Sequence, residues 1–311
     1  MKMVKDFVEG DSLLTQLLVN NVAKGVNASG SAYLNVELRD SSGAINAKKW
    51  EVSEEDEKIF VIGNIIEVGL EIINYRNALQ GKIINATLLD DESVDVSKFV
   101  KQPPIPVEEL TKRFNAHVAS IKNEDCKKLV DHFVNKFQDK IYTHPAASSI
   151  HHEYSSGLLM HVVSMADIAC CIEKMYPDIS HDLLISGIIL HDFGKTIELE
   201  GKVAYKYSLE GKLLGHISIM VGEIRKAAEE LGISKEIATI LEHMVLSHHG
   251  YLEYGSPVLP QTKEALLLSL IDNLDSKMTI VEKALEPIEK GEFSQKIFAL
   301  DNRCFYKHGI K

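Results

Sequence analysis

The spacing of hydrophobic residues changes near residue 93, and this change constrains the fold more than any other feature of the chain. Before that point, short apolar runs alternate with turn residues. The stretch AYLNVELRD places Leu34, Val36 and Leu38 on one face, which is the spacing of a half-buried strand. After it, nearly every segment has helical spacing. The 311 residues are enough for two domains, so we predict an all-β domain followed by an all-α domain.

The first part of the chain contains signals for about five strands. A DSSG turn follows AYLNVELRD, and glycines interrupt the later apolar runs. About five strands in roughly 80 residues are typical of a small closed barrel. Prolines at 103, 104 and 106 then exclude regular helix or central strand. We therefore predict a multi-domain protein with a barrel at 1–92, a linker at 93–107 and a helical domain at 108–311.

Charge and hydropathy restrict the classes of partner. The formal net charge is −11, and residues 1–92 contain 9 Lys and Arg against 15 Asp and Glu. Any binding of nucleic acid must therefore be local and depend on stacking, because a broad basic surface is absent. The N-terminal residues lack the apolar region of a signal peptide, and no uncharged run approaches the roughly 20 residues of a membrane span. We expect a cytoplasmic protein that does not bind membranes.

The cysteines argue against two kinds of stabilisation. None of them shows CxxC spacing, which opposes both a disulfide framework and a thiolate zinc site. We expect core thiols in a reducing compartment at the four positions Cys126, Cys170, Cys171 and Cys304.

Histidines and aspartates recur at the ends of the predicted helices. Several of them adjoin strongly apolar stretches, where an unpartnered imidazole or carboxylate would cost several kcal/mol. Any one histidine is more often a hydrogen-bonded core or surface residue than a metal ligand, and we assign to that class His117, His132, His181, His243 and His308. The joint pattern on separate helices indicates a metal site instead, made of His161, His191, Asp192, His216, His248, His249 and Asp272.

This pattern resembles the HD-domain metal-dependent phosphohydrolases. Their His…His-Asp…Asp motif matches His161, His191, Asp192 and Asp272, and the remaining ligands resemble those of members that hold two metals, namely His216, His248 and His249. Seven nitrogen and oxygen ligands exceed what one ion usually takes from side chains, so Asp192 is expected to bridge two divalent ions. Ligation without thiolate favours Mn²⁺, with Fe²⁺ as the alternative.

On this hypothesis, the ligands divide into two sets that share one carboxylate. The first ion is held by His161, His191, Asp192 and Asp272, and the second by Asp192, His216, His248 and His249. A water with a lowered pKa attacks phosphorus while the ions neutralise the developing charge, without a covalent intermediate.

Lys195 is the second predicted catalytic residue beside Asp192. It lies three residues after Asp192 and beyond Gly194. We expect the chain to turn back at Gly194, so that Lys195 contacts a nonbridging phosphate oxygen. An exposed lysine without a role is the alternative.

Three further residues have two interpretations each. His152 and Tyr154 precede the first ligand and are expected to line the substrate cleft, while capping of the helix that begins near Ser155 is an equally good interpretation. Asp275 lies one helical turn after Asp272 and is expected either to orient a ligand histidine or to face solvent.

The first domain resembles the nucleic-acid-binding OB-folds in the segment NVAKGVNASGSAYLNVELRDSSGAINAKKW. OB barrels hold single strands by stacking bases on aromatic side chains. The resemblance implies contacts from Tyr33 and from the NYRNALQG hairpin, at Tyr75, Arg76 and Gln80. Trp50, the only tryptophan, is assigned to the core.

An OB barrel, a proline-containing linker and a two-metal HD domain, in this order over almost the whole chain, resemble the YhaM-type 3′→5′ exoribonucleases. The resemblance implies a manganese-dependent enzyme that degrades single-stranded RNA, and also single-stranded DNA, from the 3′ end to nucleoside 5′-monophosphates. The residues alone indicate only phosphoester hydrolysis on a polymer, and they leave a homo-oligomer open.

Two alternatives belong to other functional classes. The first is an HD phosphohydrolase of a small nucleotide, such as a cyclic dinucleotide or a dNTP, with the barrel as a regulatory or oligomerisation module. The second is a non-enzymatic single-strand-binding protein with a vestigial HD site. The complete ligand set opposes the second alternative.

Overall fold

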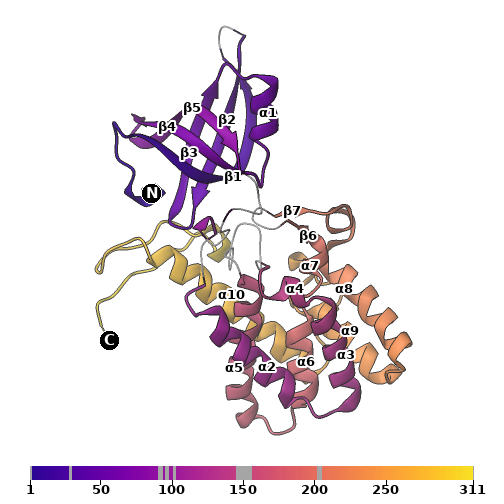
Figure 1. Ribbon diagram of the computed structural model, residues 1–311. Helices are drawn as coiled ribbons and strands as arrows, with labels where there is room; N and C mark the ends of the chain where they lie inside the picture. The colour runs from indigo at the N-terminus through magenta and orange to yellow at the C-terminus, as the bar shows by residue number, and fades with distance from the viewer. Residues whose placement is uncertain are drawn as a thin grey trace. The chain divides into compact units, whose positions relative to one another are not determined.

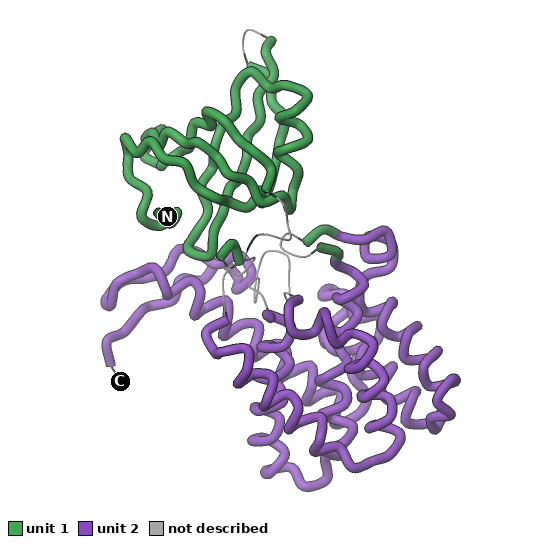
Figure 2. The backbone as a smooth tube through the Cα atoms, in the orientation of Figure 1, with its two compact units in different colours: residues 1–102, 200–206 green, residues 103–199, 207–311 purple. Residues whose placement is uncertain are grey.

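The computed structural model describes residues 2–27, 30–89, 94, 98–100, 103–144, 156–201 and 205–310. The chain forms two compact units (Figure 2), of which unit 1 comprises Met1–Gln102 and Glu200–Lys206, and unit 2 comprises Pro103–Leu199 and Tyr207–Lys311. Unit 1 is a β-barrel and unit 2 is mainly helical (Figure 1), so the predicted fold class is confirmed. Within the described ranges, no helix has the length and apolar character needed to cross a membrane.

Unit 1 is a closed barrel with the strand order β1-β2-β3-β5-β4. Strand β1 pairs antiparallel with both β2 and β4, and β3 pairs parallel with β5, which closes the barrel. Five strands closed in this way form an OB-type barrel. The elements are β1 Ser12–Val26, β2 Ala32–Asp40, β3 Gly43–Trp50, α1 Glu54–Ile59, β4 Ile65–Tyr75 and β5 Ala78–Leu88.

The side chains of β2 alternate between the barrel interior and the surface. Leu34, Val36 and Leu38 are buried, as predicted, whereas Asn35 between them is exposed. Burying one such aliphatic side chain contributes about 1.5–3 kcal/mol. Because a shift of one residue would turn all of them outward, this alternation determines the register of β2.

The predicted linker at 93–107 includes the boundary between the two units, which follows Gln102. Inside this segment, Phe99 is buried against Leu18 and Ile65 of the barrel. At its end, helix α2 begins at Val107. The described parts of the segment are therefore anchored.

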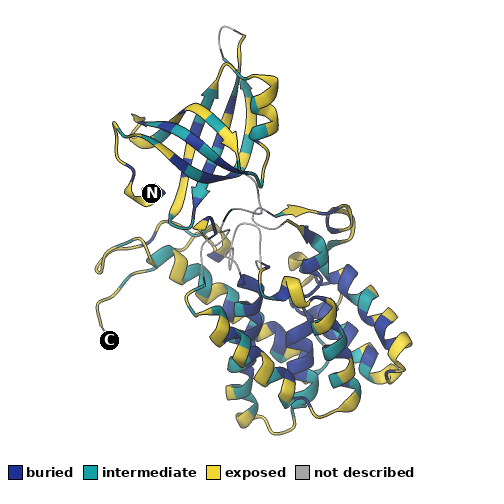
Figure 3. Ribbon diagram, in the orientation of Figure 1, coloured by how far each residue is buried: buried dark blue, intermediate teal, exposed yellow. Residues whose placement is uncertain are grey.

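Unit 2 is built around two almost completely apolar helices, α5 and α6. Most residues of both helices are buried, and buried positions also follow the inner faces of their neighbours (Figure 3). Helix α10 packs against α5 and α6, and α9 packs against α8. The helices are α2 Val107–Ser120, α3 Glu124–Lys136, α4 Gln138–Ile141, α5 Gly157–Ile172, α6 His181–Leu190, α7 Lys195–Glu198, α8 Leu209–Leu231, α9 Lys235–Ser247 and α10 Lys263–Leu285. The short strands β6 Leu199–Glu200 and β7 Lys206–Tyr207 each include a unit boundary.

Helix α8 begins at Leu209 and kinks at Gly215, whose φ of 72° is in the region that favours glycine.

One expectation about the cysteines needs correction. The expectation of four core thiols is wrong for Cys171 and Cys304, which are exposed. Cys171 lies on the outer side of α5, and Cys304 lies in the segment after α10.

Candidate metal centre and nucleic-acid interface

The predicted metal ligands meet at the ends of the buried helices of unit 2. Four of them are almost completely buried, and these are His161, His191, Asp192 and His248. Helices α5, α8 and α10 supply His161, His216 and Asp272, the turn after α6 supplies His191 and Asp192, and the turn after α9 supplies His248 and His249. The structure thus brings together residues that lie up to 111 positions apart in the chain (272 − 161 = 111).

Asp192 lies between two groups of histidines. Its Oδ2 atom is 3.4 Å from Nε2 of His191 and 3.8 Å from Nε2 of His161. Its Oδ1 atom is 3.5 Å from Nε2 of His216 and 3.8 Å from Nε2 of His248. These separations exceed hydrogen-bond lengths, but they are close to the roughly 3.4 Å between two ligands of one tetrahedral ion with bonds of about 2.1 Å. Each carboxylate oxygen therefore faces a different half of the centre.

The first half contains His161, His191 and Asp192, whose ligand atoms lie within 4.8 Å of one another. Asp272 joins them, because its Oδ1 atom is 3.3 Å from Nε2 of His161. This half therefore has two imidazoles and two carboxylates.

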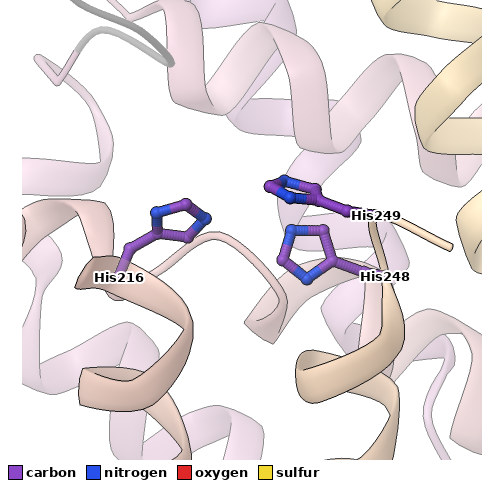
Figure 4. A group of neighbouring side chains, drawn as sticks. All are labelled: His216, His248 and His249. Carbon is purple, nitrogen blue, oxygen red and sulfur yellow. The ribbon is translucent and has the colours of Figure 1, made fainter. Parts of the chain in front are cut away.

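The second half contains only imidazoles besides Asp192. The ligand nitrogens of His216, His248 and His249 lie within 4.8 Å of one another. In Figure 4, His248 and His249 lie together at the end of α9, and His216 faces them from α8. This is the arrangement of a nitrogen-rich site for a divalent metal.

Backbone carbonyls fix the orientation of three of these imidazoles. A carbonyl only accepts hydrogen bonds, so the ring nitrogen that faces it must carry the proton. Nδ1 donates to a nearby carbonyl at 2.7 Å in His191 and in His248 and at 2.6 Å in His249, where the acceptors are Ile188, Val245 and Tyr254. The Nε2 lone pairs are thereby directed to the centre, in the tautomer that binds metal.

Carboxylates orient the other two histidines. Asp275 accepts a hydrogen bond from Nδ1 of His161 at 2.7 Å, and Glu198 accepts one from Nδ1 of His216 at 3.3 Å. The structure thus places Asp275 in the orienting role that was one of its two expected roles. Glu198 was not identified from the sequence, because nothing in the run HDFGKTIE shows that its carboxylate contacts His216.

Several buried polar atoms of the centre have no hydrogen-bond partner among the described residues. They are Nε2 of His191, Nε2 of His216, Nε2 of His248 and Oδ1 of Asp192. Leaving one such atom unpaired costs about 1–3 kcal/mol, and native proteins contain few of them. Because these four atoms lie around the Asp192 carboxylate, divalent cations bound in the two halves of the centre would satisfy them. The residues present therefore fit a metal.

The carboxylates of the centre favour positive charge, which a proton or a cation can supply. Burial opposes the ionisation of Asp192, but the charge of Lys195 holds its pKa well below the usual range. Burial lowers the pKa of His248 well below its usual value, which keeps this imidazole neutral. Burial opposes protonation of His161 too, yet its hydrogen bonds to Asp272 and Asp275 raise its pKa to about 10. The carboxylates around His161 therefore attract positive charge to this half of the centre.

Lys195 faces the centre rather than solvent. Its Nζ atom is 2.6 Å from Oδ2 of Asp192, and its side chain is 12% exposed.

The expectation that the chain turns back at Gly194 was wrong, because its φ of −57° and ψ of −24° are helical values that any residue adopts. A Cβ atom at Gly194 would lie 2.2 Å from the carbonyl oxygen of His216. Glycine is needed here for close contact between two backbone segments.

The predicted cleft residues His152 and Tyr154 lie outside the described residues.

Unit 1 carries an aromatic pair at one end of its β2–β3 ladder. The rings of Tyr33 and Trp50 have centroids 4.9 Å apart, and the Lys48 ammonium lies 5.1 Å and 5.4 Å from them. The assignment of Trp50 to the core was wrong, because its side chain is 40% exposed. Trp50 is the last residue of β3 and pairs with Tyr33, beyond the apolar interior of the barrel.

The β4–β5 turn carries the other predicted contacts. Tyr75 is 50% exposed, and the Arg76 guanidinium lies 5.3 Å from the centre of its ring. Gln80 is half-buried in β5, where it pairs with Ile73 of β4. OB-folds bind oligonucleotides with the face of strands 2 and 3 and with the loops between strands 1 and 2 and strands 4 and 5. Both aromatic groups of this barrel lie on those elements.

Comparison with known proteins connects both units to described families. The family described as HD domain matches residues 158–277, which include every predicted ligand. Over 307 residues the chain is 45% identical to the 3′-5′ exoribonuclease YhaM of Geobacillus sp. (strain WCH70), and the match covers 98% of this chain and 95% of that protein.

Two solved structures from Methanococcus maripaludis match a smaller part of the chain. One is a domain of replication protein A, with 17% identity, a TM-score of 0.25, and coverage of 29% of this chain and 94% of that one. The other is the second OB-fold domain of replication protein A, with 16% identity, a TM-score of 0.25, and coverage of 30% and 98%.

The sequence match extends over nearly the full length of both proteins and includes both units described above. With 45% identity over 98% of its length, the chain belongs to the family of the YhaM 3′-5′ exoribonuclease, in which it combines an OB-type barrel with an HD domain.

Proposed function

We propose that this protein is a metal-dependent 3′→5′ exonuclease that hydrolyses single-stranded RNA, and also single-stranded DNA, to nucleoside 5′-monophosphates. The observation that carries the proposal is the position of Asp192, whose two carboxylate oxygens face separate groups of histidines with unpaired nitrogens. The name of the Geobacillus relative supports RNA as the substrate and the 3′ end as the starting point.

The two halves of the centre would hold two divalent ions, with Mn²⁺ as the preferred metal. Asp192 would serve both sites, with His161, His191 and Asp272 in one and His216, His248 and His249 in the other. Bound divalent ions supply an activated water and neutralise charge on the phosphate. Nitrogen and oxygen ligands without thiolate suit Mn²⁺ or Fe²⁺.

The protein's own residues position the substrate. The Lys195 ammonium lies at the edge of the centre, beside Asp192, and can donate to a phosphate oxygen as negative charge grows there. In the barrel, the exposed Trp50 and the half-buried Tyr33 and Lys48 form an aromatic and cationic group that can stack on a base. Such stacking contributes about 1–3 kcal/mol for each base and tolerates any sequence, as an exonuclease requires.

The direct test is degradation of 5′-labelled RNA by the purified protein with Mn²⁺. A 3′→5′ exonuclease shortens the labelled strand gradually, so a ladder forms and nucleoside 5′-monophosphates accumulate. Asp192→Asn should abolish the ladder and lower the content of both ions. Asp178→Asn is the matched control, because this exposed aspartate pairs with Lys263 at the surface of unit 2. Immediate release of a labelled mononucleotide would indicate the opposite polarity and would contradict the proposal.

The same assay distinguishes the small-nucleotide alternative. An enzyme that acts on a cyclic dinucleotide or a dNTP would hydrolyse these compounds at least as well as RNA and would not need the barrel aromatics. We expect Trp50→Ala to slow RNA degradation at low RNA concentration and to leave hydrolysis of a dinucleotide unchanged. Loss of both activities would mean that Trp50 supports the fold rather than the substrate.

A further inference from the structure

A second cluster of metal-binding side chains lies at the far end of α5 from His161. Cys170 belongs to the last turn of α5, Glu173 opens the short 3-10 helix Glu173–Met175, and His181 begins α6. The ligand atoms of these three residues lie within 4.8 Å of one another. Cys170 follows His161 by nine positions, which is about 13 Å along a helix. The cluster is therefore separate from the nuclease centre.

His181 lies between a hydroxyl and a carboxylate. Its Nε2 is 2.8 Å from the Ser120 hydroxyl, which also lies 2.7 Å from the carbonyl oxygen of His117. Its Nδ1 is 2.8 Å from Oε2 of Glu173. Imidazole nitrogen and carboxylate oxygen are both ligands that a divalent cation takes from side chains.

His117 contacts this cluster through Cys170. Its Nε2 is 2.8 Å from Oδ1 of Asp167, a carboxylate that accepts the ring proton. Its Nδ1 is thereby left as an acceptor, 3.9 Å from Sγ of Cys170. A carboxylate on the far nitrogen is the usual means of orienting a metal-binding histidine. Burial and the charge of Arg113 lower the pKa of His117, which favours the neutral form that ligates metal.

We propose that Cys170, Glu173 and His181, with His117 as the fourth ligand, bind a divalent cation of the Zn²⁺ type. One thiolate, two imidazoles and one carboxylate make a closed tetrahedral set. The separation of 3.9 Å between Sγ of Cys170 and Nδ1 of His117 is close to the roughly 3.6 Å expected for sulfur and nitrogen on one zinc ion. On binding, Cys170 loses its proton to solvent and His181 replaces its contact with Glu173 by a bond to the metal.

This site would have a structural role that differs from that of the nuclease centre. Its ligands come from α2, α5, the 3-10 helix and α6, and the side chains of His117, Glu173 and His181 are only 13%, 23% and 32% exposed. A fully ligated ion leaves no position for substrate and instead holds these helices together. Since the ligands are spread over separate helices, no CxxC spacing marks the site in the sequence.

Cobalt(II) distinguishes this site from the nuclease centre. A thiolate bound to Co²⁺ gives a strong charge-transfer absorption in the near ultraviolet, whereas the nuclease centre offers only nitrogen and oxygen ligands. We expect the chelator-treated full-length protein to develop this band with one equivalent per chain and to lose it when Zn²⁺ is added. Cys170→Ser should abolish the band. Cys171→Ser is the matched control, because this adjacent thiol is exposed and should leave the band unchanged.

A second variant tests the ligand set with the thiol in place. His181→Gln should weaken Co²⁺ binding at this site at least about tenfold while the protein still degrades RNA with Mn²⁺. Circular dichroism and RNA degradation establish that both variants are folded. Absence of the band in the wild-type protein, its survival in folded Cys170→Ser, or unchanged affinity in folded His181→Gln would each overturn the proposal.

Discussion

Glu198 holds His216 at two points, by accepting a hydrogen bond from its backbone N–H at 3.1 Å and another from its ring Nδ1 at 3.3 Å. Asp275 has the corresponding position in the other half of the centre, where it accepts from Nδ1 of His161 at 2.7 Å. Each half therefore has one carboxylate that orients a candidate ligand histidine through the ring nitrogen on its far side. Such partners typically account for a 10–100-fold difference in metal affinity.

Replacement of Glu198 should weaken one metal site selectively. We expect Glu198→Ala to lower Mn²⁺ affinity in the half that contains His216 by about 10–100-fold, and Glu198→Gln, which keeps an acceptor oxygen, to restore part of it. Asp275→Ala is the matched variant for the other half. Isothermal titration calorimetry with Mn²⁺ should resolve two binding events, of which each variant loses a different one. Two unchanged binding events in Glu198→Ala would show that Glu198 does not position a ligand.

Lys195 should contribute to the chemical step rather than to metal binding. A protonated amine cannot ligate a metal, so Lys195→Ala should retain the ions but lower kcat by roughly 10²–10³. Lys195→Arg should recover only part of kcat, because a planar guanidinium does not reproduce a single-point donor. Elemental analysis and kcat at saturating RNA provide the two measurements. A wild-type kcat in the alanine variant would assign Lys195 to its ion pair with Asp192 alone.

The aromatic pair of the barrel should contribute to RNA affinity. Tyr33→Ala and Trp50→Ala should each cost about 1–3 kcal/mol of binding to single-stranded RNA. Fluorescence anisotropy in the inactive Asp192→Asn background measures this affinity without degradation of the ligand. Tyr176→Ala is a control with a comparably exposed aromatic in unit 2, and it should bind normally. A lowered melting temperature together with unchanged RNA affinity would show that the pair is structural.

His144 should make the stability of the protein depend on pH. Burial lowers its pKa to about 4, and its Nε2 lies 3.2 Å from the carbonyl of Leu199. Its pKa when unfolded is about 6.5. Between these two values only the unfolded chain binds the proton, so stability is present at pH 7 and is lost as the pH falls.

For this one group, the loss between pH 7 and pH 5 should be about 2 kcal/mol. Urea unfolding at both pH values, with wild-type protein and His144→Gln, measures it as the difference between the two pH dependences. Equal pH dependence in the two proteins would show that His144 titrates normally in the fold.

The sequence was sufficient to predict the barrel, the helical domain and a group of histidine and aspartate side chains that the structure brings together. Leu34, Val36 and Leu38 identify the inner face of β2 because side chains alternate strictly along a strand. Polar residues directly after a long apolar helix, such as His191 and Asp192, indicate a site because their burial requires partners.

Features that depend on tertiary contacts could not be predicted in this way. The bond from His216 to Glu198 joins residues 18 positions apart that are brought together by a kink at Gly215. The exposure of Trp50 depends on where β3 ends relative to the barrel interior, and strand ends are the least predictable part of an element. The group of Cys170, Glu173 and His181 has no CxxC spacing that would indicate it, because its residues come from separate helices.

The contact between Gly194 and the backbone of His216 has a consequence for local unfolding. A backbone segment packed this closely against another cannot leave its place without releasing the contact, and regions linked in this way tend to open as one cooperative unit. The turn that carries Asp192 and the part of α8 that carries His216 are therefore expected to open together. Thermal fluctuation would then disassemble both halves of the centre in a single event, instead of producing a protein with one half intact.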